Sequence, residues 1–113
     1  MAKYEKIVTG DIQVLSEGLH KYILDSAVSM ELIDQSSYEM GNTKVKVLVY
    51  DKYFMRNSSR ASLNVTIVSD DDTIFVSAIG AGGSQGLFLN FSWGAESELV
   101  EVVEAYLKSF HYA

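Results

Sequence analysis

The chain has 113 residues, a formal net charge of −6 at pH 7, and no cysteine. The missing cysteines exclude disulfides, thiolate metal sites and thiol catalysis. The acidic balance disfavours binding to nucleic acid or to an anionic membrane surface, because both are negatively charged.

Residues 1–113 are predicted to fold as a single domain. Nearly half of them are hydrophobic (48%) and a moderate share is charged (21%), as in globular rather than disordered proteins. No proline, linker or internal repeat divides the chain. The first residues lack the apolar core of a secretion signal, and no apolar run is long enough to cross a bilayer. We therefore expect a cytoplasmic protein that does not associate with membranes.

Two segments have apolar residues at helical spacing, three or four positions apart. In the first, which Asp11 can cap, these residues are Ile12, Leu15, Leu19, Tyr22 and Ile23. In the second, which follows Gly94, they are Leu99, Val103, Tyr106, Leu107 and Phe110. Each pattern predicts an amphipathic helix. Gly18 weakens the first helix and is expected to allow close packing on a sheet.

Alternating apolar and polar residues predict strands over residues 4–9, 28–40, 44–49, 62–67, 74–79 and 87–93. Turns are expected at Gly41-Asn42, at residues 57–59 and at residues 70–72. The element order is therefore β-α-β-β-β-β-β-α. This order predicts a two-layer α+β fold, with an antiparallel sheet of five to six strands and both helices on one face.

The helix-bearing face of the sheet is expected to hold Val45, Val47, Val49, Leu63, Val65, Ile67, Ile74, Val76, Ala78, Leu87, Leu89 and Phe91. The opposite face mixes polar and apolar residues, with Tyr50, Phe75 and Phe88 gathered on it. Such a face is suited to protein contact, and we expect a homodimer through it or through an edge strand. Scattered surface aromatics on a monomer are the alternative.

A glycine-rich segment covers residues 80–86. Its glycines miss the dinucleotide-binding spacing, and no Lys-Ser/Thr pair follows as in a Walker loop. The segment can expose backbone N–H groups as an anion nest, with Ser84 and Gln85 adding hydrogen bonds. Alternatively, the glycines allow a bulge or a close backbone approach.

Five of the nine basic residues lie between positions 44 and 60, among aromatic residues. Arginine pairs with phosphate or carboxylate, so this stretch is suited to an acidic ligand. It can also dock on the acidic second helix of a neighbouring subunit or form a charged hairpin tip. Together with the glycine-rich segment it supplies the candidate ligand-binding residues: Gly82, Gly83, Ser84, Gln85, Tyr50, Tyr53 and Arg56.

No catalytic residue, metal ligand or cofactor site is predicted. The run Asp70 to Asp72 lacks the calcium-loop spacing and indicates a solvated turn. His20 and His111 have no metal-binding signature around them. Ser84 lacks the Gly-x-Ser-x-Gly elbow of a serine nucleophile.

Three segments, VKVLVYDKY (45–53), SLNVT (62–66) and SAIGAGGSQ (77–85), resemble a family of small bacterial proteins of unknown function with a Gly-Gly-Ser-Gln motif. The resemblance covers nearly the whole chain. It implies a bacterial cytoplasmic protein and directs attention to Tyr50, Asp51, Tyr53, Asn64, Gly82, Gly83, Ser84 and Gln85. It brings no activity, cofactor or catalytic residue.

These patterns predict a non-enzymatic binding module that contacts a small ligand or a protein partner. One alternative is an enzyme that uses Asp51 or a tyrosine as its acid–base group, which requires a carboxylate enclosed beside an aromatic-lined pocket. Another is a structural or regulatory protein whose mixed sheet face is its interface.

Overall fold

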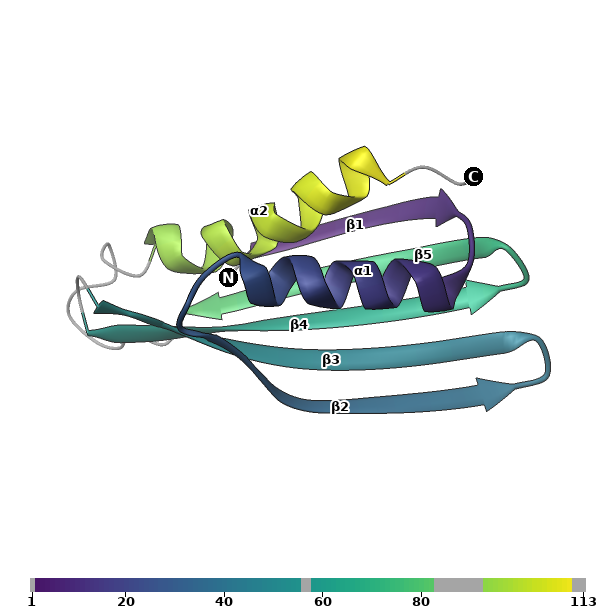
Figure 1. Cartoon of the computed structure of the whole chain (residues 1–113), viewed down its shortest axis with the longest axis horizontal. Coiled ribbons are helices and arrows are strands. Elements are labelled where there is room, and N and C mark those ends of the chain that lie inside the picture. The colour runs from purple at the N-terminus through teal and green to yellow at the C-terminus, as the bar shows by residue number, and fades with distance from the viewer. Residues whose placement is uncertain (1, 56–57, 83–92, 111–113) are drawn as a thin grey trace.

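The computed structural model describes residues 2–55, 58–82 and 93–110. Its elements are β1 (Ala2–Thr9), α1 (Ile12–Asp25), β2 (Met30–Met40), β3 (Thr43–Phe54), β4 (Ser59–Asp70), β5 (Thr73–Gly82) and α2 (Trp93–Ser109). The strands form one antiparallel sheet in the order β1-β5-β4-β3-β2, and both helices lie on one face of it (Figure 1). The predicted α+β fold is confirmed. The strand expected over residues 87–93 falls outside the described residues except at Trp93, which begins α2 instead.

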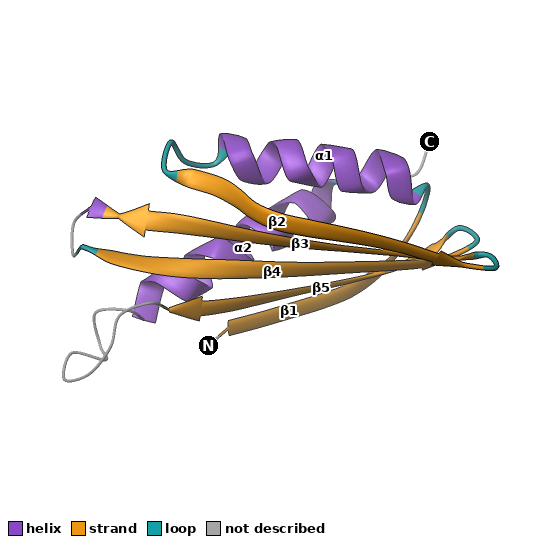
Figure 2. Ribbon diagram, turned by 90° about the horizontal axis from the view of Figure 1, so that it is seen from below, coloured by secondary structure: helices purple, strands orange, loops and turns teal. Residues whose placement is uncertain are grey.

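The connections explain this strand order. Tight turns join β2 to β3 and β4 to β5, and Gly41 and Asp71 adopt positive φ angles there (59° and 55°). β1 pairs with β5, so α1 carries the chain from one edge of the sheet to the other. The predicted cap is present, since the Gln13 backbone N–H donates to Asp11 Oδ1 at 2.7 Å. Figure 2, turned to view the sheet from below, shows α1 lying over the strands on one side.

The core lies between the sheet and both helices, and α2 packs on the strands β1, β5 and β4. Gly80 lies in β5 under the first turn of α2, and a Cβ there would come within 2.6 Å of the Glu96 backbone oxygen. This glycine therefore permits close backbone approach, as the structural interpretation of the glycine-rich segment expected. A Cβ at Gly18 would lie 2.1 Å from the Tyr106 hydroxyl. The prediction that Gly18 packs on the sheet is wrong, because its close neighbour is α2.

The predicted faces of β3 are also wrong. Leu48, Tyr50 and Phe54 are buried on the helix-bearing face, whereas Val45, Val47 and Val49 lie on the other face and are half-buried. The pairing fixes this assignment, because Leu48 lies opposite Val65 and Tyr50 opposite Leu63, both fully buried. Tyr50 is therefore not on the open face with Phe75, and Phe88 lies outside the described residues. One consequence matters for function: Lys44 and Lys46 share the face that carries the helices.

Neither helix, over the residues described, is long and apolar enough to cross a bilayer. Asp71 and Asp72 form the exposed turn between β4, which ends at Asp70, and β5, where the sequence predicted a solvated turn. Across residues 2–55, 58–82 and 93–110, no three His, Asp or Glu side chains gather as a metal site would require.

Candidate ligand-binding groove

The structure separates the ligand-binding residues that the sequence suggested. Gly82 ends β5, and its N–H donates to Glu96 Oε2 at 3.1 Å. Tyr50 points under the helices, whereas Tyr53 lies on the open face of the same strand, with the Arg60 guanidinium 5.7 Å from its ring centre. Gly83, Ser84, Gln85 and Arg56 lie outside the described residues. Tyr50 and Tyr53 therefore do not belong to one site, since residues three apart in a strand face opposite ways.

Most of the basic residues between positions 44 and 60 are paired within the chain. Lys52 Nζ lies 3.0 Å from Glu98 of α2 and 4.5 Å from the centre of the Phe54 ring. Arg60 Nε donates to Asp51 Oδ2 at 2.7 Å.

Two further lysines of this stretch lie on the helix-bearing face of β3. Lys44 Nζ lies 3.8 Å from Glu39 on β2. Lys46 is half-buried and has no ion pair within the described ranges. Among the basic side chains of this stretch that the structure describes, Lys46 is therefore the one whose charge is left for a ligand.

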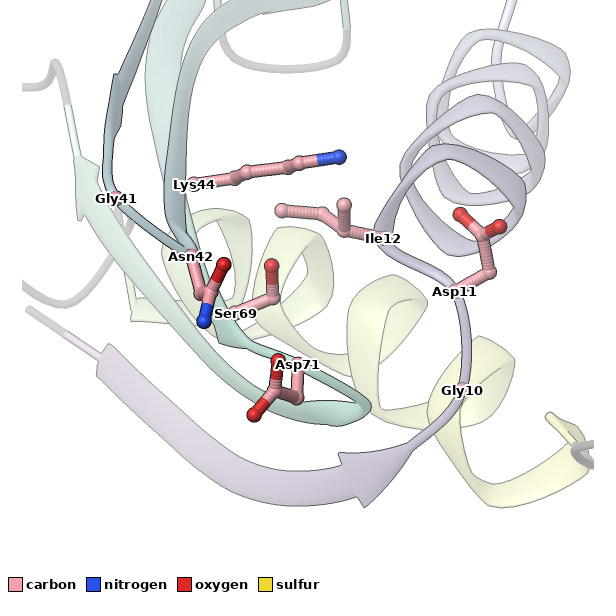
Figure 3. Close-up of a pocket in the computed structure, with 8 residues that line it drawn as sticks. All are labelled: Gly10, Asp11, Ile12, Gly41, Asn42, Lys44, Ser69 and Asp71. Atoms are coloured by element: carbon pink, nitrogen blue, oxygen red, sulfur yellow. The ribbon is translucent and has the colours of Figure 1, made fainter.

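Lys46 lies in a groove between α1 and the strands β2 and β3, which we call the α1 groove. It consists of three adjoining cavities of about 360, 100 and 180 Å³. The first two share Ile12 and Lys44, and the last two share Gln13 and Lys46. Figure 3 shows the first cavity, at the hairpin end, where Lys44 extends from β3 toward the start of α1. The third cavity is lined by Gln13, Ser16, Glu17, His20, Gln35, Lys46 and Leu48.

The side chains around the third cavity come from both walls of the groove. The α1 residues beside it continue the polar side of an amphipathic helix, next to the buried stripe of Leu15, Leu19 and Ile23. Gln35 comes from β2, where a bulge between Leu32 and Asp34 shifts the alternation of side chains by one residue. Without that shift the odd-numbered Gln35 would face away from α1.

The side chains of Gln13 and Ser16, which line the third cavity, already donate hydrogen bonds within α1. The Gln13 side-chain amide donates to Glu17 Oε2, and the Ser16 hydroxyl donates to the Gln13 carbonyl oxygen at 3.2 Å.

His20 is held by a buried tyrosine at the inner end of the groove. Tyr50 is fully buried, and its hydroxyl lies 2.7 Å from His20 Nδ1. Burial raises the pKa of Tyr50 above its ordinary value of about 10, so the hydroxyl stays protonated at neutral pH. Because a buried hydroxyl needs an acceptor, we assign the Tyr50 hydroxyl as the donor to His20 Nδ1. The ring proton is then on Nε2, which gives His20 a hydrogen-bond donor for the groove.

The α1 groove thus combines one unpaired ammonium group with neutral donors from His20 and Gln35. This set suits a carboxylate or phosphate group, because charge-assisted hydrogen bonds to a cation are the strong ones. Glu17 lines the same cavity, and one of its carboxylate oxygens accepts the hydrogen bond from the Gln13 side-chain amide.

Neither Asp51 nor Tyr50 meets the requirements for the acid–base group of an enzyme. The Asp51 carboxylate is held by Arg60 on the open face, and none of the cavities described above includes it. Burial raises the pKa of Tyr50, so its hydroxyl keeps its proton at neutral pH and cannot accept another as a general base.

Sequence reasoning missed the groove residues His20 and Gln35, and it counted Lys46 only as one of the five basic residues between positions 44 and 60. One signal was available: Gln13 and Glu17 of α1 and Lys44 and Lys46 of β3 recur on one side of their elements. This pattern indicates a polar groove between α1 and β3 only once the residues of β3 are assigned to the correct face of the sheet.

A model of the family described as "Family of unknown function (DUF6054)" matches residues 1–111, so the chain belongs to this family. No curated protein matches the chain. A solved structure, the crystal structure of TTHA0849 from Thermus thermophilus, shares 16% sequence identity over 95% of this chain and 91% of that chain, with a TM-score of 0.38. This likeness is too weak to carry an argument about fold or function.

Proposed function

We propose that this member of the DUF6054 family is a non-enzymatic binding module that holds a small organic anion in the α1 groove. The observation that carries the proposal is Lys46, a half-buried cation in the groove with no carboxylate partner among the described residues. A partly desolvated charge without a counter-ion is unfavourable. A ligand carboxylate or phosphate would supply the missing counter-charge.

The shape and the neighbouring groups support a small ligand. The cavity around His20 and Lys46 measures about 180 Å³, which is below the roughly 300 Å³ at which sites for drug-sized molecules begin. The anionic group would lie at Lys46, and Gln35 and the His20 Nε2–H would bind its oxygens. Leu48 offers an apolar contact for the remainder of the molecule.

Tyr53 and Gly82, two of the ligand-binding residues predicted from the sequence, do not line the α1 groove. Tyr53 is on the far side of the sheet, and Gly82 is tied to α2 through Glu96. A ligand contact by the Gly-Gly-Ser-Gln segment, a bacterial source and a cytoplasmic location stay predictions from the sequence.

Isothermal titration calorimetry tests the proposal with acetate, succinate, inorganic phosphate and glycerol 3-phosphate as probes. We expect at least one probe to bind, and Lys46→Met to weaken its binding at least tenfold through loss of the charge-assisted contact. Lys6→Met is the matched control, because Lys6 is another half-buried lysine on the helix-bearing face, but on β1 and outside the groove. No binding by any probe, or equal losses in the two variants, would contradict the proposal.

A further inference from the structure

We infer that a second copy of this chain packs on the open face of the sheet, face to face, about a twofold axis parallel to the strands. The open face is the side that carries no helix. Three observations support this arrangement: an apolar row across the sheet, the distribution of charge at its two edges, and a hollow beside one of those charges.

The apolar row crosses all five strands. Ile7, Phe75, Val68, Val45 and Tyr38 lie on β1, β5, β4, β3 and β2, each paired directly with the next. Ile7, Tyr38 and Phe75 remain 65%, 59% and 36% exposed. A sheet face that is left to water normally carries polar residues at such positions. A continuous apolar row instead marks a contact surface.

The size of the face fits a stable dimer. Five strands at a spacing of about 4.8 Å are about 24 Å wide, and the eight paired residues of β1 extend about 27 Å. The footprint is therefore roughly 650 Å² on each copy. Specific interfaces bury about 600–1,000 Å² per partner.

Charge decides which way the second copy lies. A second row on the same face, separated from the first by the row that contains Glu5, runs from Lys3 on β1 through Ile79, Asn64 and Val49 to Asp34 on β2. A twofold axis parallel to the strands reverses the strand order, so that β4 lies over β4 and β1 over β2. Lys3 of each copy then faces Asp34 of the other. An axis perpendicular to the strands would place β1 over β1 and would not bring Lys3 to Asp34.

The region around Asp34 has room for the incoming lysine. A hollow of about 150 Å³ on the open face is lined by Asp34, Gln35, Ser36, Val47 and Val49. The valines can pack against the methylene stem of a lysine while the carboxylate meets its ammonium group. Among the residues that the structure describes, the one ion pair of Lys3 is an exposed contact with Glu5 at 4.0 Å. Lys3 is therefore available for the cross-copy pair.

Sedimentation velocity on the full chain, over a wide concentration range, tests the inference. We expect a dimer in the unchanged protein and a monomer in Val68→Lys, because Val68 lies on β4 near the twofold axis and a buried, unpaired lysine is unfavourable. Val14→Lys is the matched control on the outer side of α1, where Val14 is 60% exposed, and should remain dimeric. Circular dichroism and the melting temperature establish that each variant is folded.

A charge exchange tests the orientation. Lys3→Glu and Asp34→Lys should each weaken the dimer about fivefold, since each creates like-charge pairs. The double variant should restore the original dissociation constant. A monomer at every concentration, or a dimer unaffected by Val68→Lys, would overturn the inference. Absence of restoration in the double variant would overturn the assigned axis.

Discussion

The two helices cover the sheet in different ways. α2 packs on β1, β5 and β4 with Leu99, Val103 and Leu107 fully buried, and Gly80 lets its backbone approach β5 closely. α1 buries one stripe of leucine and isoleucine, but its other flank faces β3 and β2 across a polar groove. The closely packed α2 half consists of α2 with β1, β5 and β4. The α1 half, which consists of α1 with β2 and β3, keeps charged and polar groups beside its buried stripe.

The largest expected effect comes from removing a leucine from the α2 half. Leu107→Ala should lower the free energy of unfolding by about 3 kcal/mol, because it leaves a cavity in a closed core. Leu48→Ala, beside the α1 groove, should cost about 2 kcal/mol or less, since its surroundings are already open to the groove. Urea denaturation measures both. An equal or larger loss in Leu48→Ala would contradict the contrast between the two halves.

A smaller effect is expected from substituting alanine for Gly80 or Gly18, the two glycines that lie close to α2. Gly80→Ala should destabilise the protein by about 2 kcal/mol, because the new Cβ meets the Glu96 backbone, which cannot move without shifting the helix. Gly18→Ala meets only the end of the Tyr106 side chain, and the helix gains about 1 kcal/mol in propensity. The free energy of unfolding of Gly18→Ala should therefore differ from that of the unchanged protein by less than about 1 kcal/mol. Thermal and urea denaturation distinguish the two, and a greater loss in Gly18→Ala would show that the α1–α2 contact is the more rigid one.

The smallest effect concerns Tyr50 and depends on pH. At neutral pH, Tyr50→Phe should cost about 1 kcal/mol, since it removes a single hydrogen bond to the half-buried His20. The Tyr50 pKa is raised in the folded state, so above about pH 10 the unfolded chain loses this proton first and stability falls as the pH rises. The fall from this group can reach about 1.4 kcal/mol per pH unit.

Urea denaturation between pH 8 and 11 should therefore show a shallower alkaline loss in Tyr50→Phe than in the unchanged protein. Tyr106, whose pKa burial also raises, is present in both proteins and cancels in the comparison. Identical slopes would mean that Tyr50 ionises as freely in the folded state as in the unfolded chain.

The helices, the hairpins and the α+β architecture could be predicted because each follows from a pattern among residues close together in the sequence. Leu15, Leu19 and Ile23 repeat every turn of α1, and Gly41-Asn42 marks a tight turn whatever surrounds it. The face of β3 could not be predicted in this way, because both sets of alternating residues contain hydrophobic side chains. Only pairing with β4 decides that Leu48 and Tyr50 are buried rather than Val47 and Val49.

The groove could not be predicted for a second reason. Its β2 side depends on the bulge after Leu32, which shifts Gln35 to the helix-bearing face, and no glycine or proline marks that position. His20 and Tyr50 are thirty residues apart and meet only in the folded chain.

The most direct test of ligand binding in the α1 groove is a ¹H–¹⁵N correlation spectrum recorded while succinate or inorganic phosphate is added. We expect the amide signals of residues 13–20, 35–37 and 46–48 to shift in a saturable manner, while those of residues 99–107 in α2 stay in place. Lys46→Met should abolish the shifts and leave the rest of the spectrum unchanged. Shifts spread over both halves, or a spectrum that does not respond to either anion, would contradict the account.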